Sequence, residues 1–138
     1  MTVISEKFSI QTKGNNDIID ITKYVQNAVY KHNLPEAVVY VYAAGSTVGI
    51  TNIEYEPGLL VDLPEILERI APSGVEYHHD ETWHDGNGHS HLRTSIVGNN
   101  TMVPLVDGVV QLGQWQQIVL IDFDTKARSR KVWVQIIY

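Results

Sequence analysis

Ala37-Val38-Val39-Tyr40-Val41-Tyr42-Ala43-Ala44 is the stretch that decides the fold. All eight residues are apolar or aromatic, and three of them are β-branched valines. A continuous run of this kind, without alternating polar residues, is typical of a strand that lies inside a sheet and is covered on both faces. We therefore predict a central strand here and expect the rest of the chain to be arranged around it.

The segments before this strand predict one more strand and a helix. Thr2–Thr12 alternates apolar and polar residues, which favours a first strand. Gly14–Asp17 is made of turn-forming residues only. A helix capped by Asp20 or Thr22 is expected next, continuing to about Asn33, where a following proline stops it.

The segments after the central strand predict further strands and helices, separated by turns. We expect strands at Val48–Ile53, Val75–Tyr77, Met102–Val106, Val109–Leu112, Gln116–Phe123 and Lys131–Tyr138, and helices at Leu59–Ile70 and Ser90–Val97. The polar segment His78–Gly88 is expected to be a loop. The pattern predicts a single α+β domain over residues 1–138, with two or three helices packed on one face of a mainly antiparallel sheet, in two layers.

The last predicted strand, Lys131–Tyr138, is long and apolar. If such a strand lies at the edge of a sheet, its unpaired backbone groups invite pairing with another chain. We therefore expect an oligomer.

Bulk composition excludes several classes of protein. The formal net charge is −6 and the pI about 5.4, so no basic surface is available to neutralise a nucleic-acid backbone. The chain has no cysteine, which excludes disulfides, thiolate chemistry and cysteine-based zinc modules. No apolar run approaches the roughly 20 residues of a membrane helix. No signal peptide is visible, and we expect a cytoplasmic protein without nucleic-acid or membrane partners.

Five of the six histidines fall within fourteen residues, from His78 to His91, together with Asp80, Glu81, Asp85 and Asn87. Imidazole and carboxylate are the groups that bind Zn²⁺ when thiolate is absent. A single histidine is more often packed or capping, but this density favours a metal site. We predict His79 and His91 as the central pair of ligands and His89 as the third, although on a helix His89 and His91 would diverge.

Five other residues are weaker candidates for function. Ser46 and Thr47 follow a glycine and are able to donate hydrogen bonds to a phosphate, although such turns are common. Glu54 follows a strand and is a candidate acid, base or ligand, yet alone it resembles a surface carboxylate. Trp115 alone would be a core residue. A short basic group near the C-terminus, including Arg128, has the charge to hold a phosphate.

At these residues the sequence resembles the YjbQ family of small uncharacterised proteins, some of which carry the name secondary thiamine-phosphate synthase. The similarity spans most of the chain and depends on the ordered set of its motifs. These are Ser46-Thr47-Val48-Gly49-Ile50-Thr51 with Glu54 and Pro57, Tyr77-His78-His79-Asp80, Asn87-Gly88-His89-Ser90-His91-Leu92-Arg93-Thr94-Ser95, Gly98, Val103-Pro104, Asp107-Gly108, Leu112-Gly113-Gln114-Trp115-Gln116-Gln117-Ile118, and the Arg128–Arg130 stretch.

The resemblance implies a homotrimer with sites at or near subunit contacts and a bound divalent ion, and His79 and His91 match the family's histidines. The implied reaction joins a hydroxymethyl-pyrimidine diphosphate to a thiazole phosphate and releases diphosphate. A metal on these histidines, assisted by Arg93 or Arg128, would neutralise the leaving group. Tyr77, Trp83 or Trp115 would stack on the substrate ring.

Two alternatives stay open. In the first, a Zn²⁺-bound water with Glu54, Asp80 or Glu81 as its base makes the protein a hydrolase. In the second, the metal is structural and the chain forms a non-catalytic trimer. A catalytic site keeps an open coordination position, whereas a structural site is closed by four protein ligands.

Overall fold

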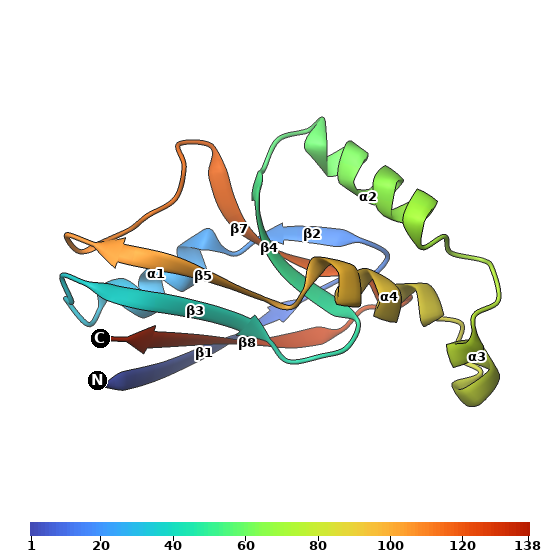
Figure 1. Cartoon of the computed structure of the whole chain (residues 1–138), viewed down its shortest axis with the longest axis horizontal. Helices are drawn as coiled ribbons and strands as arrows, with labels where there is room; N and C mark the ends of the chain where they lie inside the picture. The colour runs from blue at the N-terminus through green and yellow to red at the C-terminus, as the bar shows by residue number, and fades with distance from the viewer.

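The computed structural model describes all 138 residues as eight strands and four helices (Figure 1). In chain order these are β1 (Val3–Gln11), β2 (Asp17–Asp20), α1 (Thr22–Tyr30), β3 (Ala37–Ala43), β4 (Val48–Glu54), α2 (Leu59–Ile70), α3 (His78–Trp83), α4 (Gly88–Val97), β5 (Asn100–Val106), β6 (Val109–Val110), β7 (Gln116–Asp122) and β8 (Ser129–Ile137).

The strands form two antiparallel sheets, one with the order β1-β8-β3-β5-β6 and the other with the order β2-β7-β4. The main core lies between the two sheets. It joins Val41 and Val134 of the five-stranded sheet to Ile50 and Leu120 of the three-stranded sheet, with Val25 of α1. The fold is thus a curled pair of sheets in one α+β domain.

A smaller cluster covers the other face of the three-stranded sheet. Val119 and Ile121 of β7, with Phe123 just after it, pack there against Leu67 of α2, and Val97 of α4 lies beside them. The single α+β domain and the antiparallel pairing confirm the prediction, but helices on one face of one sheet, in two layers, were wrong. The strands divide between two sheets, α1 packs into the main core with both of them, and α2 and α4 cover the other face of the three-stranded sheet.

The quoted stretch Ala37–Ala44 forms β3, the middle strand of the five-stranded sheet, as predicted. The prediction that this strand is covered on both faces was wrong for the single chain. Val39, Val41 and Ala43 are fully buried, while the alternate residues point to an outer face that no helix covers and where Val38 is 42% exposed. Alternation across a strand hides this difference in a run of apolar residues.

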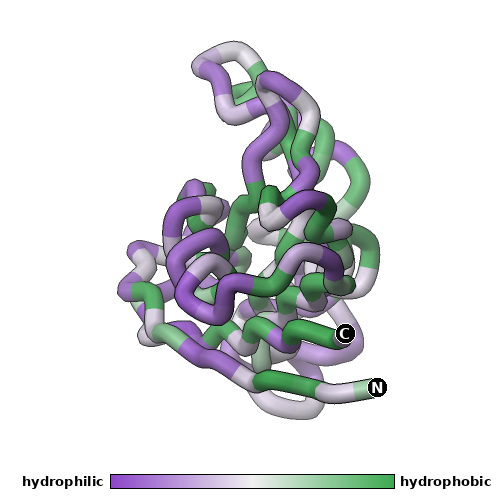
Figure 2. Tube along the Cα trace, turned by 90° about the vertical axis from the view of Figure 1, so that its left-hand side faces the viewer, coloured by the Kyte–Doolittle hydropathy of each residue, from purple (hydrophilic) through white to green (hydrophobic).

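The terminal strand β8 is not an edge strand. β1 pairs with it along its whole length, from Val3 opposite Ile137 to Gln11 opposite Ser129, and β3 pairs on its other side. The two ends of the chain therefore lie side by side, and Figure 2 shows hydrophobic stretches where β1 begins and β8 ends. The argument for an oligomer from an exposed β8 edge was therefore wrong.

Four local predictions also need correction. Asp17–Asp20 forms strand β2, because left-handed residues at Gly14, Asn15 and Asn16 turn the chain back along β7. Val75–Tyr77 is extended but unpaired, so the predicted short strand is absent. His78–Trp83 is a helix, α3, within the predicted loop. Helix α1 ends at Tyr30, three residues early, and Asn33 is left-handed.

A buried ion pair closes one end of the two sheets. The Arg130 guanidinium donates to both carboxylate oxygens of Asp122, each at 2.7 Å, and to the Thr47 hydroxyl at 2.8 Å. Asp122 is fully buried and also accepts a hydrogen bond from Thr12. These contacts join β1, β4, β7 and β8 at the end where α4 begins.

None of the four helices combines the length and the apolar character needed to cross a lipid bilayer.

We expect Arg130→Met to destabilise the fold by about 3–5 kcal/mol, because the substitution leaves the Asp122 carboxylate buried without its cation. Urea unfolding monitored by tryptophan fluorescence measures the change. Lys131→Met, at the neighbouring exposed position, is the matched control and should alter the free energy of unfolding by no more than about 0.5 kcal/mol. Equal effects of the two substitutions would contradict the role of Arg130 as the cation that neutralises Asp122.

Candidate functional site

The imidazoles of His79 and His91 lie together, with ring centroids 4.1 Å apart and planes tilted by 34°. His79 is in α3 and His91 is in the first turns of α4. Figure 1 shows α3 beyond the end of the sheets, on the side away from the chain termini. The pair therefore depends on how α3 is held against the start of α4.

Two features of the backbone hold α3 in place. The Asp80 carboxylate accepts the backbone N–H of Gly88, the first residue of α4, at 3.1 Å and that of Tyr77 at 3.4 Å. Gly88 has no side chain, and a Cβ there would lie only 2.7 Å from the Cβ of Tyr77. The absence of a side chain at this position lets α3 approach α4 closely enough for the two imidazoles to meet.

Two carboxylates lie beside this pair. His79 Nδ1 is 3.6 Å from Asp85 Oδ1 and 3.7 Å from Asp80 Oδ1, and ligand atoms of all three residues lie within 4.8 Å of one another. His79 Nδ1 is buried and has no hydrogen-bond partner. Two atoms each about 2.1 Å from a tetrahedral Zn²⁺ lie about 3.4 Å apart, so this spacing suits a shared ion better than a hydrogen bond.

The protonation states also suit a metal. Burial lowers the pKa of His91 below its ordinary value, and the neighbouring His79 lowers it further. Burial alone would raise the pKa of Asp80, but the N–H groups of Gly88 and Tyr77 and the nearby His79 bring it below its ordinary value. Neutral imidazole and ionised carboxylate are the forms that bind divalent cations. The residues present therefore fit a divalent ion.

A second polar group adjoins the first through Asn87. The buried Asp124 carboxylate accepts hydrogen bonds from the Asn87 amide at 3.3 Å, from Arg128 Nε at 2.9 Å and from the Thr47 hydroxyl at 3.2 Å. Burial alone would raise the pKa of Asp124, but the backbone N–H of Thr125, Arg128 and Asn87 lower it to about 2. Asp124 is thus a fixed negative charge that holds the partly exposed Arg128 side chain in place.

The structure places two predicted residues away from this pair. His89 and His91 are two residues apart on α4, so their side chains leave the helix about 200° from one another. His89 is 6% exposed and does not share the cluster of His79, Asp80 and Asp85. Arg93 is buried, and its guanidinium donates to the backbone carbonyl of Ala71, to Asn16 and to Glu68.

The remaining predicted residues divide between the two ends of β4 and β7. Thr47 lies at the same end as Asp124, but its hydroxyl is engaged by Arg130 and Asp124, while Ser46 beside it is exposed. Glu54 pairs with Gln116 at the other end, next to Trp115, which is 67% exposed. Six residue steps along β4 are about 20 Å, so within one chain Glu54 and Trp115 do not reach the imidazole pair.

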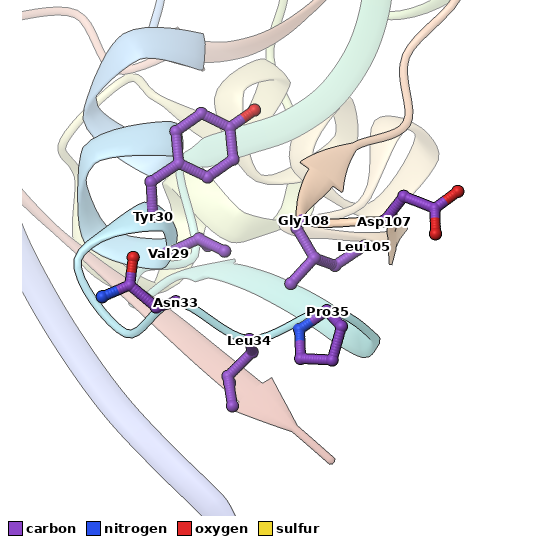
Figure 3. Close-up of a pocket in the computed structure, with 8 residues that line it drawn as sticks. All are labelled: Val29, Tyr30, Asn33, Leu34, Pro35, Leu105, Asp107 and Gly108. Carbon is purple, nitrogen blue, oxygen red and sulfur yellow. The ribbon is translucent and has the colours of Figure 1, made fainter.

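Two hollows open on the surface. One lies between the C-terminal end of α1 and the turn after β5, with a mixed polar and apolar lining that includes Tyr30, Leu34 and Asp107 (Figure 3). It lies at the end of β5 away from α4. The other lies along α3 and the segment before it, and its lining includes Tyr77, Asp80 and His84. It touches the cluster at Asp80 alone, since neither His79 nor His91 lines it.

Sequence reasoning missed the part played by Asp85, Asn87 and Asp124. Asp85 and Asn87 were noted among the histidines but not selected, and the signal for Asp124 was Arg128 four residues later, a spacing that allows an ion pair. Nothing in the local pattern indicated that Asn87 and Asp124 would meet, since they are 37 residues apart.

A family model described as UPF0047 protein YjbQ-like matches residues 6–138. The chain belongs to the YjbQ-like family, UPF0047. A UPF0047 protein of Archaeoglobus fulgidus is 35% identical over 129 residues, covering 94% of this chain and 98% of that protein. UPF0047 protein YugU of Bacillus subtilis is 27% identical over 129 residues, covering 92% and 94%. The family resemblance inferred from the motifs is confirmed.

Solved structures of YjbQ-like proteins share the fold. A YbjQ-like protein of unknown function from Sulfolobus solfataricus gives a TM-score of 0.92 at 26% identity, covering 99% of this chain and 97% of that chain. An uncharacterised YjbQ/UPF0047 protein from Clostridium acetobutylicum gives 0.87 at 32% identity, covering 96% and 99%. None of these four descriptions names a reaction.

We expect the pH dependence of stability to depend on His89. Burial, and then the nearby Arg93, lowers the pKa of His89 below 6.5 in the folded chain, so the unfolded chain binds a proton more readily. The stability that neutral His89 provides is fully present above about pH 6.5. It is lost as the pH falls from there through the lowered pKa that His89 has in the folded chain. With a chelator present to remove metal ions, the His89→Gln variant should therefore lose less stability than the original protein when the pH is lowered from about 7.5 to about 5.5.

Urea midpoints at the two pH values measure this difference. His78→Gln, whose side chain is fully exposed, is the control and should keep the pH dependence of the original protein. An unchanged pH dependence in His89→Gln would show that His89 titrates alike in the folded and unfolded chains.

Proposed function

We propose that this YjbQ-like protein is a metal-dependent enzyme that acts on a small phosphorylated heteroaromatic substrate in the cytoplasm. The candidate reaction joins hydroxymethyl-pyrimidine diphosphate to thiazole phosphate and releases diphosphate. The observation that carries the proposal is the cluster of His79, His91, Asp80 and Asp85, in which a buried imidazole nitrogen has no hydrogen-bond partner.

His79, His91 and Asp85 are the residues best placed to hold the ion, with Asp80 beside them. The two imidazoles favour Zn²⁺ over Mg²⁺, which takes oxygen ligands. When bound, such an ion neutralises negative charge that develops on a phosphoryl oxygen. The side chains of His79 and Asp85 are 28% and 46% exposed, so the cluster is open to a substrate on one side.

Arg128 is the best candidate for holding the substrate phosphate. Its Nε and Nη2 atoms contact Asp124 at 2.9 and 2.8 Å, while its side chain remains 40% exposed. Its Nη1 atom makes no hydrogen bond within the chain, and the planar guanidinium suits phosphate geometry. Arg93 is less suited to this role, because its contacts with Ala71, Asn16 and Glu68 occupy its donors.

A Zn²⁺-dependent hydrolase is the second candidate, because two carboxylates, Asp80 and Asp85, lie beside the imidazoles. One of them would bind the ion and the other would accept a proton from a bound water. Asp80 is poorly matched to that task, since its low pKa makes it a weak base. Release of phosphate from simple phosphate esters, without condensation, would favour this candidate.

We expect His79→Ala to weaken Zn²⁺ binding at least about tenfold and to abolish turnover, because a ligand atom is lost. Isothermal titration with Zn²⁺ and an assay with the two named substrates measure the effects. His78→Ala is the matched control: the neighbouring imidazole is fully exposed and only approaches Glu81, at 3.5 Å.

Equal Zn²⁺ affinity in the His79 and His78 variants would contradict the metal site. A protein that binds Zn²⁺ but neither converts the substrates nor binds phosphate would favour the non-catalytic alternative. Arg128→Ala should weaken inorganic phosphate binding while the circular dichroism spectrum stays unchanged.

The proposed homotrimer is supported by the uncovered outer face of the five-stranded sheet. Tyr40 and Met102 lie opposite one another there, Met102 is 65% exposed, and Tyr42 and Trp133 form the next pair along. An apolar and aromatic surface of this kind is typical of a contact between proteins.

We expect Met102→Lys to shift the protein from trimer towards monomer, because the charge would be buried in an apolar contact. Light scattering after size-exclusion chromatography measures the mass. Asn27→Lys, at an exposed position on α1, which packs on the inner side of that sheet, should leave the mass unchanged. A monomeric original protein would contradict the proposal.

A further inference from the structure

The Asn87 side chain lies between two carboxylates. One end of its amide is 2.9 and 3.3 Å from the two oxygens of Asp85, and the nitrogen at the other end is 3.3 Å from Asp124 Oδ1. Asn87 is only 7% exposed, so water does not solvate the amide freely. A carboxylate accepts hydrogen bonds but does not donate them when ionised, so the amide nitrogen satisfies one carboxylate and its oxygen faces the other.

The two orientations of the amide differ in what they require. With the nitrogen towards Asp85, the amide donates to that carboxylate, and its oxygen faces Asp124. With the nitrogen towards Asp124, the oxygen lies against Asp85 with no donor to pair with. Two acceptor oxygens in contact in a buried place repel one another unless a cation lies beside them.

Asp124 favours the second orientation. Its carboxylate is buried, and it also accepts hydrogen bonds from the Thr125 N–H at 2.8 Å and from Arg128 Nε at 2.9 Å. An ionised, buried carboxylate is a strong acceptor for the amide N–H. The Asn87 oxygen is then directed at Asp85, whose carboxylate lies 3.6 Å from the unpaired His79 Nδ1.

We infer that Asn87 supplies its side-chain oxygen as a further ligand of the divalent cation, and that Asp124 is the positioning residue that turns this oxygen towards the ion. The inference rests on the metal site proposed above and adds a ligand to it. With the amide nitrogen on Asp124, the side-chain oxygen would join His79, His91 and Asp85 as a ligand.

The test is the affinity for Zn²⁺ by isothermal titration of the full chain. Asn87→Ala removes the oxygen and should weaken binding at least about tenfold. Asn87→Asp keeps an oxygen at the same place and should bind Zn²⁺ at least as tightly as the original protein. If Asn87 acted only through its amide N–H, both variants would bind Zn²⁺ weakly. The two variants therefore separate a ligand role of the oxygen from a structural role of the N–H. Asn100→Ala, at an exposed position on β5, should bind like the original protein.

Asp124→Asn tests the positioning role. It should weaken Zn²⁺ binding in the presence of Asn87 and have no further effect in the Asn87→Ala background, because the two residues act through one amide. Side-chain amide resonances of Asn87 should also shift when Zn²⁺ is added, which remains measurable if a variant folds poorly. Asn87→Ala binding as tightly as the original protein, or Asn87→Asp binding as weakly as Asn87→Ala, would overturn the inference while the metal site stands. An original protein that binds no Zn²⁺ would overturn both.

Discussion

Two buried aspartates near the end of β7 hold this molecule together at the end where α4 begins. Asp122 is neutralised by Arg130 and fixes the junction of β1, β4 and β8. Asp124, two residues later, instead faces Asn87 and Arg128. Buried carboxylates require partners because their desolvation is costly, so the chain segments that supply those partners are drawn to one place.

The site follows from this arrangement. β7 places Asp124 under the start of α4, and α4 places His91 towards α3. Asp80 and the absence of a side chain at Gly88 then bring His79 to His91. The unpaired imidazole nitrogen of His79 and the carboxylates of Asp80 and Asp85 form a cluster of acceptors near the surface. Deeper in the molecule, the carboxylates of Asp122 and Asp124 are paired with arginines. Such a cluster is suited to a cation.

The opposite end of the sheets has a different character. Glu54 and Trp115 lie there, separated from the imidazole pair by the length of β4 and β7. The outer face of the five-stranded sheet carries Tyr40, Met102 and Trp133 without a helical cover. If subunits associate, these surfaces are the ones available for contact, and residues that are distant in one chain then need not be distant in the assembly.

The sequence by itself determined the elements whose signal is local. Helical spacing predicted a helix at about Leu59–Ile70, β-branched runs predicted β3, β4 and β7, and the density of histidines indicated the segment in which His79 and His91 meet. Only the tertiary structure decided that β1 covers β8, that the strands divide into two sheets, and that Arg93 binds Ala71 and Glu68 rather than facing the imidazoles. These outcomes depend on pairings between residues far apart in the chain, and hydrophobic periodicity carries no information about which partner a strand or a charge will meet.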